Sequence, residues 1–135
     1  KTMNPITKNS LFRLKKNTLL REYIDISNEF VNLKKKNKFY RTIYRNESYF
    51  QIFLLILECY VDEKKIYESY ISKHLHCSKL TTQKYLGDFY ESGIVILVTD
   101  KLDKRKKNII FTEKMLVEIS KIIKFFSNRV DFKGF

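Results

Sequence analysis

Apolar side chains recur at helical spacing along residues 9–45. The repeated positions are Leu11, Leu14, Leu19, Tyr23, Ile26, Phe30 and Leu33, and Phe39, Tyr40, Ile43 and Tyr44 continue the apolar content after a gap. A repeat of about three to four residues places such side chains on one face of a helix. The gap is the basic run 34–38, which predicts an exposed helix end or loop between two helical segments.

A second stretch, residues 47–61, is apolar on most faces and follows Asn46, a residue suited to cap a helix. A helix that is apolar all round is usually buried, so we expect this one at the centre of the core. After a short polar segment, a further helix is expected over 66–74, with Ile71 and Leu75 facing inward.

The turn at 76–78 leads into another predicted helix, which Ser78 caps and which runs to about Ser92. Gly93 is expected to end this helix, because glycine favours the backbone conformation that follows a helix. One face of the helix carries Thr82, Leu86 and Phe89, while Lys79, Thr81 and Lys84 point elsewhere.

The hydrophobic period changes after the glycine. Residues 94–99 form a β-branched run and predict a strand, 100–108 form a charged loop, and 109–111 predict the return strand. Thr112 is expected to cap a last helix, and 128–135 are expected to form a loose tail. The inward side chains of the last helix are expected to be Ile119, Ile122, Ile123 and Phe126.

The order of these elements is helix, short turn, helix, glycine, strand, charged loop, strand, helix. This order is typical of a winged helix-turn-helix, in which the second helix of the turn enters the DNA major groove and the charged loop reaches an adjacent groove or the backbone. The predicted fold class is therefore mainly α with a small β-wing.

Three segments in and around the predicted wing resemble the MarR family of transcription regulators, and the resemblance covers residues 50–127. The segments are Glu91-Ser92-Gly93-Ile94-Val95, Asp103-Lys104-Arg105-Lys106-Lys107 and Phe111-Thr112-Glu113-Lys114. In the family, a Gly-Leu-Val sequence precedes an Asp-x-Arg wing, and a Leu-Thr pair opens the following helix. The spacing is the same in this chain, since Asp103 lies ten residues after Gly93 and Thr112 nine residues after Asp103.

The resemblance implies a DNA-binding role for particular residues. Arg105 would enter the minor groove, where the negative potential favours a guanidinium, and Asp103 would orient it by a charge-assisted hydrogen bond. The implied contacts of the recognition helix are Ser78, Lys79, Thr81 and Lys84. The winged fold favours DNA contact also for Lys101, Lys104, Lys106 and Lys107, although such a run can be a merely solvated hairpin tip.

The chain departs from the family pattern at three places. Met115 stands where the family usually has glycine, Leu80 is apolar where the family often has a small polar residue, and the first wing strand carries no basic residue. The high lysine content, short length and sparse glycine are also similar to the Sar-type regulators of the same superfamily.

The charge distribution favours a polyanion as the partner, which for a winged helix-turn-helix would be double-stranded DNA. The net charge is +12, with 12 basic and 4 acidic side chains in residues 1–50 and 10 basic and 5 acidic in 94–135. Residues 51–93 carry 5 basic and 6 acidic side chains. Neutralising phosphates releases counterions and so favours binding, although a lysine-rich, solvated surface is the alternative explanation.

The sequence contains no recognisable catalytic or cofactor-binding pattern. A phosphate loop, a nucleophile motif and a carboxylate pair on an apolar background are all missing, so neither an enzyme nor a cofactor is expected. No metal is expected either, because His74 and His76 do not face one site and no further cluster completes the ligands. Cys59 and Cys77 are expected to be packed thiols rather than redox switches.

The predicted assembly is a homodimer that acts in the cytoplasm, at the nucleoid. Residues 1–45 would form an N-terminal helical dimerisation segment, 46–112 the winged helix-turn-helix DNA-binding domain, and 113–135 a C-terminal dimerisation helix with its tail. No apolar run is long enough to predict a membrane span, and no secretory signal is recognisable. Some of the tyrosines and phenylalanines are suited to line a pocket for a small-molecule effector, which family members often bind.

Two alternative functions share this fold. One is a DNA-binding module of plasmid, phage or replication control. The other is a winged helix used for protein–protein contacts, against which the basic wing argues.

Overall fold

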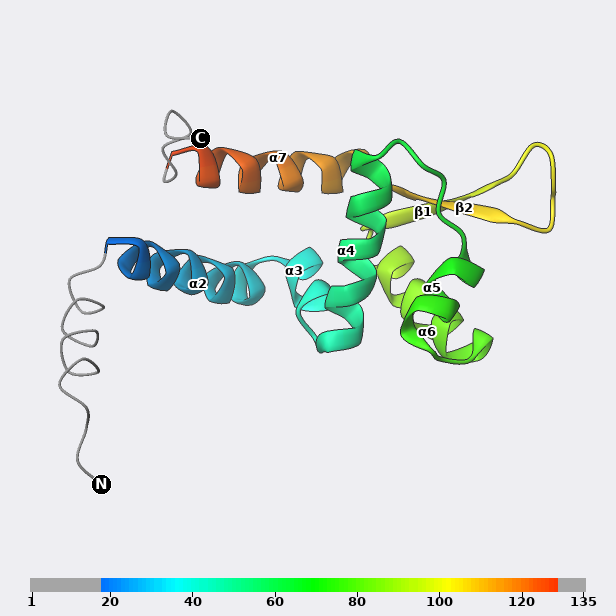
Figure 1. Ribbon diagram of the computed structural model, residues 1–135, viewed down its shortest axis with the longest axis horizontal. Helices are drawn as coiled ribbons and strands as arrows, with labels where there is room; N and C mark the ends of the chain where they lie inside the picture. The colour runs from blue at the N-terminus through cyan, green and yellow to red at the C-terminus, as the bar shows by residue number, and fades with distance from the viewer. Residues whose placement is uncertain (1–17, 129–135) are drawn as a thin grey trace, which may run out of the picture. The chain divides into compact units, whose positions relative to one another are not determined.

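The computed structural model describes residues 18–128 of the protein (Figure 1). The chain divides after Leu33 into two compact units. The expected apolar positions Leu11 and Leu14 and the expected tail beyond Asn128 lie outside the described residues. Among residues 18–128, no helix is both long enough and apolar enough to cross a bilayer.

The first unit is represented by α2 (Thr18–Lys36), of which residues 34–36 are assigned to the second unit. No residue of this helix is buried, and Leu19, Tyr23 and Val31 are more than half exposed. The basic run occupies its last turn, as expected for an exposed helix end. Cations at this end of a helix also interact favourably with the helix dipole.

The second unit opens with α3 (Lys38–Ile43), because Asn37 interrupts the helix and starts a new one. The Asn37 side chain accepts a hydrogen bond from the Phe39 amide at 2.8 Å, which satisfies a donor at the start of the helix. Phe39, Tyr40 and Ile43 are buried. The second unit therefore includes α3.

The central helix of this unit is α4 (Glu47–Val61), which Asn46 caps as predicted by accepting from the Tyr49 amide. In Figure 1, α3 lies on one side of α4, and α5 and α6 lie on the other. Ile52 and Ile56 are buried, but Phe50 is 37% and Leu54 44% exposed. The helix therefore lies in the core as expected, although one of its faces is partly exposed.

The helix-turn-helix consists of α5 (Glu68–Leu75) and α6 (Lys79–Glu91). Ile71, Leu86 and Phe89 are at most 3% exposed and form the core between these helices and their neighbours. The helix α5 begins two residues later than predicted, because Tyr67 forms an isolated bridge with Asn108 and Ile66 is hydrogen-bonded to β2. The Ile66 amide donates to Asn108 Oδ1 at 3.0 Å, and its carbonyl accepts from the Ile109 amide at 2.9 Å.

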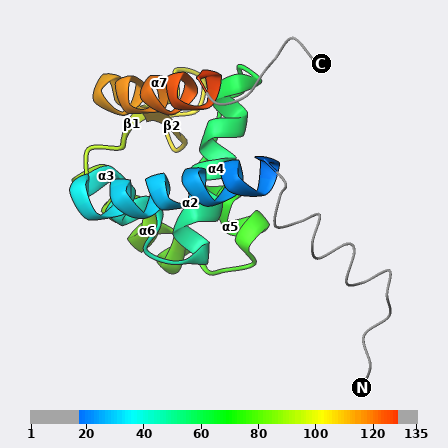
Figure 2. The same ribbon diagram turned by 90° about the vertical axis from the view of Figure 1, so that its left-hand side faces the viewer.

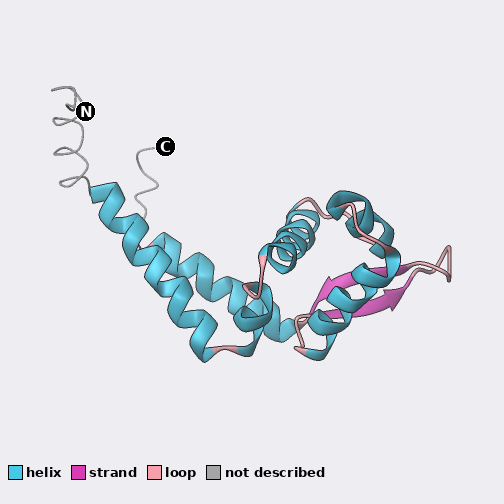
Figure 3. Cartoon of the chain, turned by 90° about the horizontal axis from the view of Figure 1, so that it is seen from below, coloured by secondary structure: helices cyan, strands magenta, loops and turns pink. Residues whose placement is uncertain are grey.

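The wing is an antiparallel hairpin of β1 (Val95–Thr99) and β2 (Lys107–Phe111), joined by residues 100–106, the wing loop. Figure 2 shows the hairpin from a second side. In Figure 3, where the strands are magenta, the loop of the hairpin projects beyond the helices. Gly93 connects α6 to β1 with a φ of +80°, a conformation that favours glycine. β2 starts earlier than predicted because Lys107 pairs with Thr99.

The last helix, α7 (Glu113–Ser127), begins where predicted, with the Thr112 side chain accepting from the Met115 amide. Met115 is fully buried, so the position where the MarR family usually has glycine is filled here by a core side chain. The prediction that four later side chains of α7 face inward is wrong. Ile119, Ile122 and Phe126 are only half-buried, and Ile123 is 60% exposed. The winged unit covers the first turn of α7 and leaves these later apolar side chains accessible.

Candidate nucleic-acid interface

The candidate recognition helix is α6, because it is the second helix of the helix-turn-helix and one of its faces is exposed. Thr82, Leu86 and Phe89 are buried, as the sequence predicts. Lys79 and Lys84 are exposed, and so is Leu80, at 79%. The exposed side of α6 therefore carries two lysines together with Leu80 and, near the end of the helix, Tyr90, which is 58% exposed.

Two of the expected DNA contacts, Ser78 and Thr81, meet at the start of α6. The Ser78 hydroxyl accepts from the Thr81 amide at 3.1 Å and donates to the Thr81 hydroxyl at 2.9 Å. This N-cap satisfies one helix donor and fixes both hydroxyls at the first turn. Positive partial charge at a helix N-terminus favours a phosphate there.

The C-terminal half of α6 is tied to α3 and α4 by polar contacts that sequence reasoning missed. Arg45 Nη1 forms an ion pair with Asp88 Oδ2 at 2.9 Å, and the Tyr49 hydroxyl donates to the same oxygen. Burial, together with the Asp88 carboxylate, raises the pKa of Tyr49, which keeps the hydroxyl a donor. A second link joins Thr42 Oγ1 and Ser92 Oγ at 2.6 Å. These contacts fix the direction of α6.

The wing loop contains the predicted contact between Asp103 and Arg105. Asp103 Oδ1 accepts from the Arg105 amide at 3.1 Å and from Nε at 3.2 Å. The two side chains meet in the turn of the wing loop, between β1 and β2. The Arg105 side chain is 92% exposed, so the contact orients the guanidinium without covering it.

The remaining basic side chains of the wing lie on the surface. Those at the four expected positions, Lys101, Lys104, Lys106 and Lys107, are all exposed. Lys106 Nζ lies 5.3 Å from the centre of the Tyr67 ring, in a cation–π contact with the segment that precedes α5. The wing therefore carries four lysines around one oriented arginine.

The base of the wing loop is held by Asp100, which the sequence analysis did not single out. Its side chain is only 7% exposed, although it stands at the end of an exposed strand. Hydrogen bonds from the Tyr67 hydroxyl and from two loop amides hold the pKa of this carboxyl well below its usual range. An aspartate after a strand often starts a turn, but no local pattern points to Tyr67, 33 residues away.

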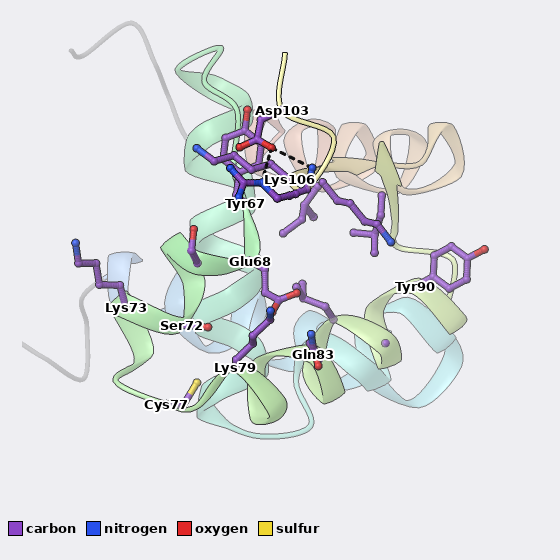
Figure 4. Close-up of a pocket in the computed structure, with 17 residues that line it drawn as sticks. Tyr67, Glu68, Ser72, Lys73, Cys77, Lys79, Gln83, Tyr90, Asp103 and Lys106 are labelled. Carbon is purple, nitrogen blue, oxygen red and sulfur yellow. Dashed lines mark hydrogen bonds and ion pairs between the residues drawn. The ribbon is translucent and has the colours of Figure 1, made fainter. Parts of the chain in front are cut away.

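A cleft of about 1080 Å³ separates α5 and α6 from the wing (Figure 4). In Figure 4, Lys79 and Gln83 of α6 lie on one side, and Asp103 and Lys106 of the wing lie on the other. The charged side chains that line the cleft are Lys73, Lys79, Arg105, Lys106, Lys107, Glu68 and Asp103. Five cations against two carboxylates make it a suitable place for an anionic chain.

The structure offers little for metal or redox chemistry among the described residues. Within 18–128, no group of three histidine, cysteine, aspartate or glutamate side chains is placed to share a metal ion. Cys59 is buried, and burial raises the pKa of its thiol. Cys77 is half-buried, and its Sγ lies 3.1 Å from Thr82 Oγ1 in the turn before α6.

Solved structures resemble this chain, although no protein-family model and no curated protein matches its sequence. One is the heme sensor protein PefR in complex with heme and carbon monoxide, with a TM-score of 0.51 and 18% identity over 93% of this chain and 75% of that one. Another is MepR of S. aureus in complex with DNA, with a TM-score of 0.50 and 16% identity over 88% of this chain and 84% of that one. This likeness confirms the predicted MarR-like winged-helix fold.

Proposed function

We propose that this chain is a double-stranded-DNA-binding transcription regulator of the MarR-like type. The observation that carries the proposal is the pairing of α6 with an exposed basic wing across a cleft whose lining is mainly cationic. A helix in the major groove and a wing in the neighbouring minor groove are separated by one sugar–phosphate strand. The cleft lies where that strand would pass.

The side chains divide between the two grooves. Lys79 and Lys84 lie on the exposed side of α6, where they can reach base edges or phosphates of the major groove. Arg105, held by Asp103, is suited to the minor groove, because a guanidinium loses less hydration than an ammonium on entry. The wing lysines supply phosphate contacts. MepR, which resembles this chain in fold, was solved as a DNA complex.

The protein acts as a homodimer in this proposal. Val117 and Ile123 of α7 are 55% and 60% exposed, and α2 exposes Tyr23 and Val31. Apolar side chains in such numbers on two helices favour a second copy of the chain as their cover. Two copies present two recognition helices to half-sites about one helical turn apart. Light scattering at micromolar concentration is expected to give twice the monomer mass, and a monomer would contradict this part of the proposal.

The regulator would act in the cytoplasm, without enzymatic activity of its own. A small-molecule effector stays a prediction, because the described residues do not identify a ligand. Control of plasmid, phage or replication functions uses the same DNA contacts. Mapping the bound sites across the source genome distinguishes control of plasmid, phage or replication functions from regulation of other genes.

Fluorescence anisotropy with a labelled random duplex tests DNA binding itself, in a series of salt concentrations. We expect the affinity to fall steeply with salt, with a slope that reports the number of phosphates contacted. A variant carrying Lys104→Ala, Lys106→Ala and Lys107→Ala is the matched probe and should have a slope smaller by about two to three. No binding at low salt would contradict the proposal and favour a protein–protein role for the wing.

A further inference from the structure

We propose that Asp100 and Tyr67 form a wing anchor, a pair of positioning residues that sets the shape of the wing loop and thereby the orientation of Arg105. This inference rests on the proposed function, since the orientation of Arg105 matters only if the wing meets DNA. The anchor acts on Arg105 only through Asp103. It is therefore distinct from the residues that contact DNA.

The two oxygens of the Asp100 carboxylate have different partners. Oδ1 accepts from the Leu102 amide at 2.7 Å and from the Asp103 amide at 3.1 Å, which folds the wing loop back on its own start. Oδ2 accepts from the Tyr67 hydroxyl at 2.5 Å and from Lys65 Nζ at 3.4 Å. One oxygen shapes the loop, and the other fastens it to the segment that precedes α5.

The shape that Asp100 imposes continues to Arg105. The Asp100 amide donates to the Lys106 carbonyl at 2.9 Å, and the Lys106 amide donates to the Asp103 carbonyl at 3.0 Å. These bonds close the loop around Asp103, whose carboxylate then accepts from the amide and Nε of Arg105. A continuous series of hydrogen bonds therefore leads from Tyr67 to the guanidinium.

Tyr67 is itself fixed at the sheet edge. It pairs with Asn108 of β2 in an isolated bridge, and its ring carries the cation–π contact with Lys106. The loop is thus fastened to one residue at two points, the Asp100 carboxylate and the Lys106 ammonium.

A purely electrostatic account of the wing predicts the opposite role for Asp100. A carboxylate beside a DNA-binding loop repels phosphate, so its removal should strengthen binding. If Asp100 positions Arg105 instead, its removal weakens binding, because a loosened arginine must be ordered again when it enters the groove. The sign of the effect therefore separates the two accounts.

The test is a double-mutant cycle on one duplex, measured by anisotropy for the wild-type chain, Asp100→Ala, Arg105→Ala and the double variant. We expect Asp100→Ala to weaken binding on the order of tenfold, and the double variant to bind no more weakly than Arg105→Ala alone. Tyr67→Phe removes only the hydroxyl and should weaken binding less. Asp62→Asn, which removes an exposed carboxylate outside the wing, is the charge control and should bind at least as tightly as the wild type.

A second readout needs no DNA. In Asp100→Asn and Tyr67→Phe, the amide protons of Leu102 and Asp103 should exchange with solvent faster than in the wild type, while those of α6 keep their protection. These mild substitutions also carry the test if Asp100→Ala fails to fold.

The outcomes separate the two proposals. If the wild type binds no duplex, the proposed function fails, and the exchange rates alone decide whether the anchor holds the loop. If the wild type binds but the losses of Asp100→Ala and Arg105→Ala multiply in the double variant, the anchor is overturned. Tighter binding by Asp100→Ala, or unchanged exchange at Leu102 and Asp103, would overturn it as well.

Discussion

The recognition helix and the wing are fixed to the same unit by different forces. The helix α6 is held by apolar side chains such as Leu86 and Phe89, which are 3% and 0% exposed. The wing loop has no such side chain: its one large apolar residue, Leu102, is 96% exposed, and polar bonds to Asp100 replace packing. The difference means that the position of α6 is set by the core, whereas the position of the wing loop depends on a few directed hydrogen bonds.

The largest effect is expected when a leucine is truncated to alanine in the packed region, and the same truncation in the wing loop provides the comparison. Leu86→Ala should lower the free energy of unfolding by about 2–5 kcal/mol, because it removes a buried side chain and leaves a cavity. Leu102→Ala should change it by less than about 0.5 kcal/mol. Urea denaturation followed by circular dichroism measures both, and similar losses in the two variants would remove the distinction between packed helix and bonded loop.

Within the wing, the arginine is expected to matter more than its neighbours. Arg105→Ala should cost about 1–3 kcal/mol of DNA-binding free energy, the range for a good base-specific contact. Lys106→Ala should cost less, since an exposed lysine contributes mainly a phosphate contact, and Arg105→Lys should restore only part of the loss. Anisotropy titrations at one salt concentration measure all three. Equal losses from Arg105→Ala and Lys106→Ala would indicate a generic basic patch.

On the helix, Lys84→Ala tests whether α6 reads bases or only touches the backbone. If Lys84 contacts a base, the loss on the preferred duplex should be about 1–3 kcal/mol and smaller on random DNA. If Lys84 contacts phosphate, all duplexes should weaken alike and the salt slope should fall by about one. Unchanged binding to every duplex would remove Lys84 from the interface.

The sequence predicted the packed helices better than the wing loop, which is held by hydrogen bonds. Helical periodicity and the caps Asn46, Ser78 and Thr112 located α4, α6 and α7, because these features are local to each helix. The sequence analysis was wrong about the inward face of α7, because beyond Met115 the apolar side chains are only half-buried or exposed. An apolar repeat does not say whether its cover comes from the same unit.

The candidate site was predicted as a set of residues but not as a geometry. The Asp103–Arg105 contact was implied by the resemblance of the wing motif to the family. The partners of Asp100 were not, because Tyr67 and Lys65 belong to a segment that reaches the wing only through the fold. The link between Arg45 and Asp88 was missed for the same reason, since 43 residues separate them.

A smaller effect on DNA binding than that of Arg105→Ala is expected from loss of the orienting carboxylate in the loop. Asp103→Ala should weaken DNA binding by about 1 kcal/mol, less than Arg105→Ala, because the guanidinium remains but loses its charge-assisted partner. The affinity is measured on the same duplex, with circular dichroism as the control for folding. Tighter binding by this variant would mean that its negative charge matters more than its hold on Arg105.

The most direct test of the account is methylation protection on a bound duplex. Dimethyl sulfate reacts with guanine N7 in the major groove and with adenine N3 in the minor groove, so one experiment reports both contacts. We expect protection at guanine N7 under α6 and at adenine N3 in the adjacent minor groove, with Arg105→Ala removing only the adenine protection. A saturated complex that protects neither position, or an adenine pattern that Arg105→Ala leaves unchanged, would contradict the claim that helix and wing read neighbouring grooves.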